Sequence, residues 1–205
     1  MAKNHGARGK LVRKFGANIF GNPKYDKLLN RKSYSPGQHG QGRSSRLSNF
    51  GLQLKEKQKI KFMYGLLEKQ FSNCFEKADK MKGETGTNLL QLLERRLDNI
   101  VYRLGFALTR PSGRQLVSHG HFFLNGRKVN IPSAFIKKGD VIQVRDKSKK
   151  MDIILESVKR IKGDLDISWL ELDKAKMQGT ILDIPERDQM DQTINDRLVV
   201  ELYSK

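Results

Sequence analysis

The chain has 205 residues, of which 40 are Lys or Arg and 22 are Asp or Glu, so its formal net charge is +18 at pH 7. This charge favours a polyanionic partner, and nucleic acid ranks ahead of a membrane because no run of about 18 apolar residues is present. The single cysteine, Cys74, excludes an intramolecular disulfide and an all-cysteine metal site. Without a hydrophobic signal core at its start, the chain is expected to be cytoplasmic and reduced.

The first part of the chain is strongly basic. Residues 1–55 hold twelve basic residues and one acidic residue, Asp26, whereas residues 163–205 hold five basic and ten acidic residues. Gly, Asn, Ser and Pro are frequent in the first fifty residues, and neither a helical nor a strand period is sustained there. We therefore expect an extended N-terminal arm that is ordered by RNA contacts and by packing on the next helix.

A helical pattern begins at Leu52. Apolar residues recur at spacings of three and four as far as Ala78, which predicts one helix with a single buried face. The lysines on its opposite side are expected to face phosphates, because they continue the basic arm. Residues 83–87 break the pattern, and Asn88 is expected to cap a second helix whose apolar face continues to Leu104.

A compact unit is predicted after residue 105. Thr109 can cap a short helix that ends at Gly120. The Asn-Gly pair at 125–126 lies between strand-forming residues and predicts a two-residue hairpin, and residues 141–145 predict a further strand. Basic and hydrogen-bonding side chains fall on the short helix and the hairpin, which suits recognition of folded RNA through phosphate, ribose and shape contacts.

Motifs along the whole chain resemble the small-subunit ribosomal protein S-four family, in its bacterial, zinc-free form. The motifs are Ser35–Gly40, Leu54–Lys59, Tyr64–Phe71, Arg96–Gly105, Thr109–Arg110, Arg114–His119, Leu124–Asn130 and Val199–Lys205. The resemblance implies a structural protein, not an enzyme, that binds small-subunit ribosomal RNA directly and nucleates assembly of the body of the particle. It also implies a place near the channel by which messenger RNA enters the subunit, contacts with neighbouring small-subunit ribosomal proteins, and support of translational accuracy.

The expected fold class is α+β, with a mainly helical lobe and a small inserted RNA-binding module of helices and a short antiparallel sheet. Residues 1–95 would form the basic arm and the helical lobe, and residues 96–158 the RNA-binding module. Residues 159–205 would form an acidic C-terminal segment that packs back on the helical lobe, with its apolar end at 198–203 docked there.

The side chains expected to contact RNA are basic or hydrogen-bonding and come from the arm, the first long helix and the module. They are Arg8, Lys10, Arg13, Lys14, Arg43, Arg46, Lys55, Lys57, Lys59, Lys61, Arg96, Arg103, Arg110, Arg114, Gln115, Ser118, His119, Arg127 and Lys128. Arg46 matches the family more firmly than Arg43, and Arg96 and Arg103 are expected to support the module's surface. Some relatives carry a four-cysteine zinc site in the arm, but residues 9–31 contain no cysteine, so neither a metal nor a cofactor is expected.

Two other functions are compatible with the composition. An RNA-modifying enzyme could use the same module for targeting, but the rest of the chain has no phosphate-binding loop that ends in Gly-Lys-Ser/Thr and no Cys/His cluster. The pair His119 and His121 lacks a third ligand nearby, and the glycines of 37–42 lack a preceding apolar strand. A basic DNA-binding protein is the second alternative, although neither a helix-turn-helix nor a basic zipper is evident.

Overall fold

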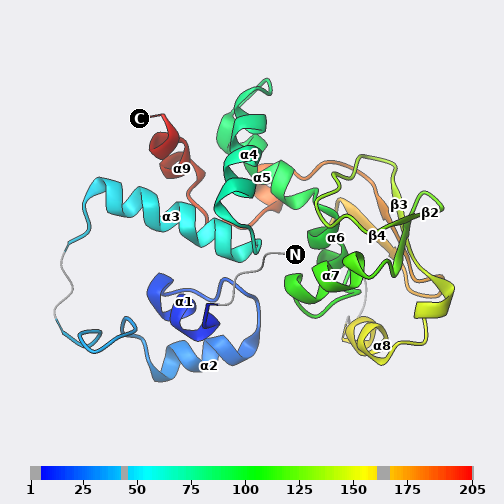
Figure 1. Cartoon of the computed structure of the whole chain (residues 1–205), viewed down its shortest axis with the longest axis horizontal. Coiled ribbons are helices and arrows are strands. Elements are labelled where there is room, and N and C mark those ends of the chain that lie inside the picture. The colour runs from blue at the N-terminus through cyan, green and yellow to red at the C-terminus, as the bar shows by residue number, and fades with distance from the viewer. Residues whose placement is uncertain (1–5, 43–45, 161–166, 205) are drawn as a thin grey trace. The chain divides into compact units, whose positions relative to one another are not determined.

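The computed structural model describes residues 6–42, 46–160 and 167–204, in which two compact units are found (Figure 1). The first unit contains the chain up to residue 77 and the segment from residue 192 onward, and the second contains residues 78–191. Helices occur together with a small antiparallel sheet, which confirms the α+β class.

The first unit is helical. Its elements are α1 (Arg8–Phe15), α2 (Pro23–Arg31), α3 (Asn49–Met63), most of α4 (Glu68–Asp79) and α9 (Asp196–Tyr203). Helix α9 packs along α3, and Val199 is fully buried. The Tyr203 ring stacks on Phe75 with 4.2 Å between ring centroids, and Gln53 Nε2 donates a 2.9 Å hydrogen bond to Glu201. The predicted docking of residues 198–203 on the helical lobe is therefore confirmed.

The prediction of an extended N-terminal arm is wrong, because residues 8–15 and 23–31 are helical. Helix α1 buries Val12 and Phe15 on one side, and the side chain of Asn22 caps α2 by accepting a 3.0 Å hydrogen bond from Lys24 N. The arm does pack on the next long helix, since the rings of Phe15 and Phe62 lie 6.1 Å apart. Packing therefore stabilises helices that are too short to form alone.

The single helix predicted for residues 52–78 is two helices. Gly65 adopts φ 65°, its amide donates to the Phe62 carbonyl at 3.2 Å, and the Leu66 amide donates to the Lys61 carbonyl at 2.9 Å. This pair of hydrogen bonds is a Schellman motif, which ends α3 and needs a residue in the left-handed region. The apolar spacing continues across the break because both helices face one core.

The second unit joins helices to a sheet. Its elements are α5 (Thr85–Glu94), α6 (Leu97–Arg103), α7 (Arg110–Ser118), β1 (Phe122–Leu124), β2 (Arg127–Val129), β3 (Val141–Val144), η1 (Asp146–Ser148), α8 (Asp152–Lys159), β4 (Leu170–Asp173), β5 (Gln178–Ile181) and η2 (Arg187–Gln189). The strands run in the order β2-β1-β3-β5-β4, and every neighbouring pair is antiparallel. Leu97, Leu104, Phe106 and Phe122 are fully buried in the core that joins α6, α7 and the sheet.

Three details of the second unit differ from the sequence analysis. The single helix predicted to start at Asn88 and to continue to Leu104 is two helices, α5 and α6, which are separated at residues 95–96. Asn88 does not cap α5, which begins at Thr85; its buried side chain instead donates to the carbonyl oxygens of Ala78 and Lys82 at 3.4 and 3.3 Å. Residues 170–181 form β4 and β5, and β5 pairs with β3, so part of the acidic C-terminal segment completes the sheet of the module. The division into domains at 95/96 and 158/159 stays a prediction.

Candidate nucleic-acid interface

Helix α7 has the start and the end that the sequence predicts. The Thr109 hydroxyl accepts a 3.3 Å hydrogen bond from Ser112 N, which caps the first turn. At the other end the amide of Gly120 donates to the Val117 carbonyl at 2.8 Å, and that of His121 donates to the Leu116 carbonyl at 3.2 Å. Leu116 and Val117 are buried, so the opposite side of α7, which carries Gln115 and His119, remains exposed.

The hairpin between β1 and β2 confirms the prediction from its Asn-Gly pair. Asn125 and Gly126 adopt φ 49° and 77°, the positive values that a type I′ turn requires. The Asn125 side chain accepts a 2.8 Å hydrogen bond from Val141 N and donates one of 2.8 Å to Asp140. The hairpin tip is thus tied to β3, so its basic residues are presented on a fixed backbone.

The end of α7 and strand β2 form one surface. A Cβ placed on Gly120 would lie 2.5 Å from Lys128 Cε, so the Lys128 side chain crosses directly over the end of α7. Neighbouring residues of a strand point to opposite faces of a sheet, so Arg127 and Lys128 cannot both lie on this surface. The structure brings Lys128 to the helix end, whereas exposed Arg127 shares its face with Val129, which packs against the core.

A cluster of positive groups surrounds His121 on this surface. Burial lowers the pKa of His121 below its ordinary value, and the charges of His119, Arg145 and Lys128 lower it further. The rings of His119 and His121 lie 6.0 Å apart, and His121 Nδ1 is 2.9 Å from Ser148 Oγ. The negative charge of a bound phosphate would raise the pKa of His121 and favour uptake of a proton from solvent.

Beneath the surface, a buried carboxylate orients two arginines. Glu94 is 1% exposed and accepts hydrogen bonds from Arg103 at 2.6 and 3.1 Å and from the Asn99 amide at 2.6 Å. Asn99 Oδ1 in turn accepts a 2.8 Å hydrogen bond from Arg110 Nε, and the Arg110 guanidinium lies 4.7 Å from the centre of the Tyr102 ring. Arg103 and Arg110 are therefore held in fixed positions by α5 and α6.

Three further residues of this unit that are predicted to contact RNA, Arg96, Ser118 and Arg114, also interact with neighbours inside the unit. Arg96 is 2% exposed and forms a two-pronged ion pair with Asp98 at 2.9 and 3.1 Å, so a direct contact to RNA does not fit its burial. The Ser118 hydroxyl donates to the Arg114 carbonyl at 2.8 Å, within α7 itself. Arg114 is half-buried, and its burial lowers the pKa of its guanidinium, which the nearby charge of Asp98 partly offsets.

In the first unit, α1 carries four of the predicted contact residues. The Arg13 guanidinium donates to the carbonyl oxygens of Tyr34 and Ser35 at 3.0 Å, so it holds the loop that follows α2. Arg8 lies over the ring of Phe20 at 5.6 Å. Lys10 and Lys14 are exposed, and their side chains have no partner within the described ranges. The two lysines are therefore the α1 residues best placed for phosphates.

The lysines of α3 do not form the uniform phosphate-facing row that the sequence predicts. Lys57 and Lys61 both pair with Glu68, the second at 2.8 Å, and Lys59 pairs with Glu56 at 3.1 Å. Although burial raises the pKa of Glu68, the hydrogen bonds from the two lysines lower it below its ordinary value. Lys55 has no such partner in the part of the chain that the structure describes.

Exposed Arg46 lies just before α3, and Arg43 falls outside the described residues. All the proposed contacts with RNA stay predictions.

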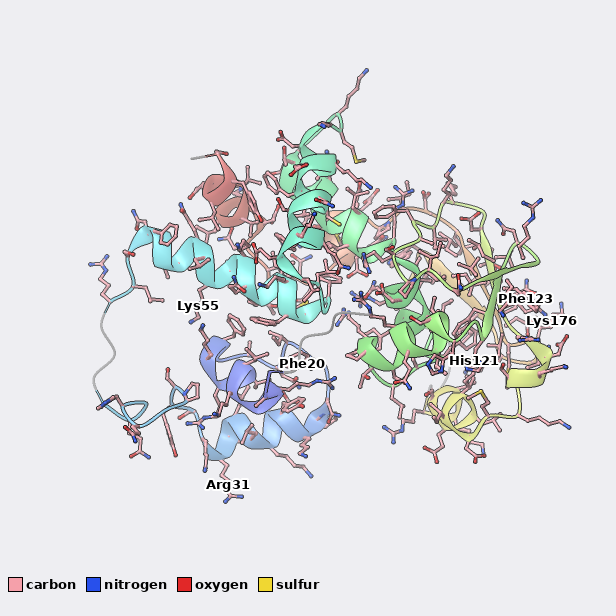
Figure 2. The ribbon with its side chains drawn as sticks, in the orientation of Figure 1. Phe20, Arg31, Lys55, His121, Phe123 and Lys176 are labelled. Carbon is pink, nitrogen blue, oxygen red and sulfur yellow. The ribbon has the colours of Figure 1, made fainter. Side chains whose placement is uncertain are left out.

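Sequence reasoning missed several basic residues. Lys24, Lys27 and Arg31 lie on α2 at spacings of three and four, a helical signal that the expectation of an extended arm concealed. Figure 2 shows Arg31 extending outward from α2. His121 and Arg145 were missed because β1 and β3 bring them together with Lys128 only in the folded sheet.

Within the described ranges, no group of three or more His, Cys, Asp or Glu side chains could hold a metal ion. None of the described helices is long and apolar enough to span a bilayer.

The chain is similar to ribosomal proteins along its whole length. Residues 3–94 match the family described as Ribosomal protein S4/S9 N-terminal domain, and residues 95–142 match the S4 domain. Over 205 positions the chain is 52% identical to the small ribosomal subunit protein uS4 of Parabacteroides distasonis and 48% identical to that of Chlorobium luteolum, with 100% of each chain covered. It is also 52% identical over 209 positions to the uS4 of Geobacter sp. strain M21, with the same full coverage. These relatives carry the name of a structural ribosomal protein, which supports the prediction that the chain is not an enzyme.

Proposed function

The chain belongs to the uS4 family of small ribosomal subunit proteins, and from this premise we propose that it binds small-subunit ribosomal RNA directly as a structural constituent of the subunit. The observation that carries the proposal is the surface formed by the end of α7 and the β1–β2 hairpin. There His119, His121 and Lys128 lie together on a rigid frame without a carboxylate partner among the described residues.

The geometry of this surface suits folded RNA. Lys128 and His119 can meet phosphates, and exposed Gln115 can hydrogen-bond a ribose hydroxyl or a base edge. Half-buried Phe123 is the cross-strand partner of Lys128 and offers part of an aromatic ring beside it. Fixed donors on a helix and a hairpin select an RNA shape rather than a sequence.

The first unit supplies a second basic surface. Lys10, Lys14 and the cations of α2 are free of internal ion pairs in the described part of the chain, so they can release counterions from the RNA backbone. A protein with two such surfaces can hold two RNA segments at once, which supports the proposal that it binds early and nucleates assembly of the body of the subunit.

Neighbouring small-subunit proteins are further proposed partners. Leu47, which precedes α3, and Phe50 and Leu52, in its first turns, are 46%, 56% and 42% exposed, and apolar side chains that are exposed close together are typical of contact sites for other proteins. We also place the protein in ribosomes of the cytoplasm, near the channel by which messenger RNA enters, where it would support translational accuracy.

Two measurements test the proposal. The native protein is expected to co-sediment with small ribosomal subunits, and the purified protein is expected to bind folded small-subunit ribosomal RNA more tightly than duplex DNA at the same salt concentration. Equal affinity for both polymers would favour a general nucleic-acid-binding protein and would contradict a ribosomal role.

A further inference from the structure

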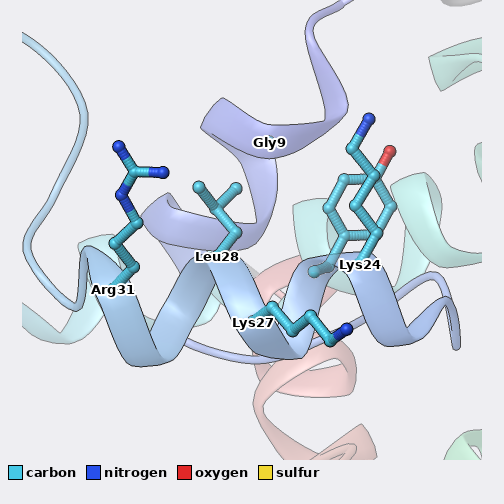
Figure 3. Close-up of a pocket in the computed structure, with 6 residues that line it drawn as sticks. Gly9, Lys24, Lys27, Leu28 and Arg31 are labelled. Carbon is cyan, nitrogen blue, oxygen red and sulfur yellow. The ribbon is translucent and has the colours of Figure 1, made fainter.

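Helices α1 and α2 form an open pocket of about 430 Å³ in the first unit (Figure 3). The residues that line it are Gly9, Lys24, Tyr25, Lys27, Leu28 and Arg31. Sites for small molecules commonly have volumes of about 300–1,000 Å³. The pocket is therefore large enough for a nucleobase and its sugar.

The inner wall of the pocket is apolar. Figure 3 shows Leu28 pointing from α2 toward α1 at Gly9, and a Cβ on Gly9 would lie 3.1 Å from Leu28 Cδ2. Because residue 9 has no side chain, Leu28 packs directly against the backbone of α1 and forms the apolar wall of the pocket. Beside it, the Tyr25 ring is held by Phe20, with centroids 5.6 Å apart and an angle of 53° between the rings. An aromatic ring next to an aliphatic side chain is a surface on which any unpaired base can stack.

The rim of the pocket is positively charged. The side chains of Lys24, Lys27 and Arg31 have neither an ion pair nor a hydrogen bond within the described residues. The only carboxylate of α2, on Asp26, accepts a 2.8 Å hydrogen bond from Asn18 instead. Three cations around an apolar wall match the chemistry of a nucleotide, whose flat base carries phosphates at its edge.

We propose that this pocket binds one unpaired nucleotide of ribosomal RNA, with the base against Tyr25 and Leu28 and the flanking phosphates on Lys24, Lys27 and Arg31. The inference rests on the proposed function and adds a base-binding site to a surface otherwise assigned to the RNA backbone. An acidic peptide would satisfy the cations but would leave the aromatic wall without a stacking partner. A paired base cannot enter, because it is stacked inside its own helix.

The test uses the full-length protein and two variants that alter the pocket in different ways. Gly9→Leu places a side chain against Leu28 and so displaces Leu28 into the pocket, and Tyr25→Ala removes the stacking ring. Tyr25→Phe keeps the ring, and Asn30→Leu adds an apolar side chain to the exposed side of α2 outside the pocket. Each variant is titrated at one salt concentration with a single-stranded RNA of about 12 nucleotides, an RNA duplex of the same length, polyglutamate and free AMP, and circular dichroism confirms that it is folded.

We expect Gly9→Leu and Tyr25→Ala to weaken binding of the single strand by about tenfold and binding of the duplex by less than about twofold, while both control variants bind like the wild type. Equal losses for the single strand and the duplex would overturn the proposal, as would a loss confined to polyglutamate. Free AMP that binds as tightly as the single strand would contradict the assignment to an RNA chain. If Gly9→Leu and Tyr25→Ala both bind the single strand as the wild type does, the pocket does not bind a nucleotide. If the wild type fails to bind folded ribosomal RNA, the proposed function itself is wrong.

Discussion

The two basic surfaces of the molecule hold their positive charges in different ways. In the first unit Lys10, Lys14 and the three cations of α2 have no ion pair within the described ranges. In the second unit Glu94 and Asn99 fix Arg103 and Arg110, whereas His119 and Lys128 have no carboxylate partner among the described residues. Lysine side chains without internal partners can adjust to phosphates in many positions, whereas arginines held in fixed positions fit only one arrangement of phosphates or bases. We propose from this comparison that the first unit contributes affinity for RNA and that the second unit selects which RNA is bound.

The largest effect is expected from the buried carboxylate of the second unit. Glu94→Gln removes the charge that holds Arg103 and should lower the free energy of unfolding by about 3 kcal/mol, because a buried ion pair loses one partner. The measurement is urea denaturation. The matched control is Glu171→Gln, at the exposed position of β4, which should lower the free energy of unfolding by less than about 0.5 kcal/mol. Equal costs would mean that Glu94 does not organise the unit.

Removal of a half-buried arginine from α7 should affect RNA binding more than folding. Arg114→Ala is expected to weaken binding to folded small-subunit ribosomal RNA by about 1–3 kcal/mol, the scale of a specific contact. Lys159→Ala, at an exposed position of α8, removes the same charge away from the proposed surface and should cost much less. Titrations at fixed salt, with circular dichroism as the folding check, compare the two variants. Equal losses of binding free energy in the two variants would mean that the module attracts RNA only through its overall positive charge.

A smaller effect is expected from pH. The pKa of His121 lies below its ordinary value of 6.5 in the free protein, and a phosphate nearby would raise it, so the complex holds more protons than its separate parts. Affinity should therefore rise by up to about tenfold as the pH falls from about 7 to about 5.5. His121→Asn should remove most of this rise, while His39→Asn, in an exposed loop, should keep it. A flat pH profile in the wild type would show that no phosphate lies near His121.

Local signals account for much of what the sequence predicts correctly. The cap at Thr109, the stop at Gly120 and the turn at 125–126 each depend on a few adjacent residues, and the structure contains all three. Helix α1 could not be found in this way, because it is stabilised by the packing of Val12 and Phe15 on a core assembled from distant segments. Helix α2 does carry local signals, namely the cap at Asn22 and the spacing of its cations, but the expectation of an extended arm concealed them.

The candidate site was only partly predictable for the same reason. Charge and spacing point to Lys10 and Lys128, but they do not reveal which cations a distant carboxylate neutralises. Lys57 and Lys61 share Glu68, and Arg96 is buried with Asp98. The cluster of His121 with Lys128 and Arg145 depends on strand pairing, which fixes contacts that sequence spacing does not encode.

The salt dependence of binding tests the two-surface account most directly. The logarithm of the affinity for folded small-subunit ribosomal RNA is plotted against the logarithm of salt concentration for the wild type, for Arg114→Ala and for the double variant Lys10→Ala, Lys14→Ala. The account predicts that the double variant lowers the slope by about 1.5 without changing the preference for ribosomal RNA over an unrelated RNA duplex. Arg114→Ala should reduce that preference and change the slope by less than about 1. Identical changes in slope and preference from the two variants would contradict the division of labour between the units.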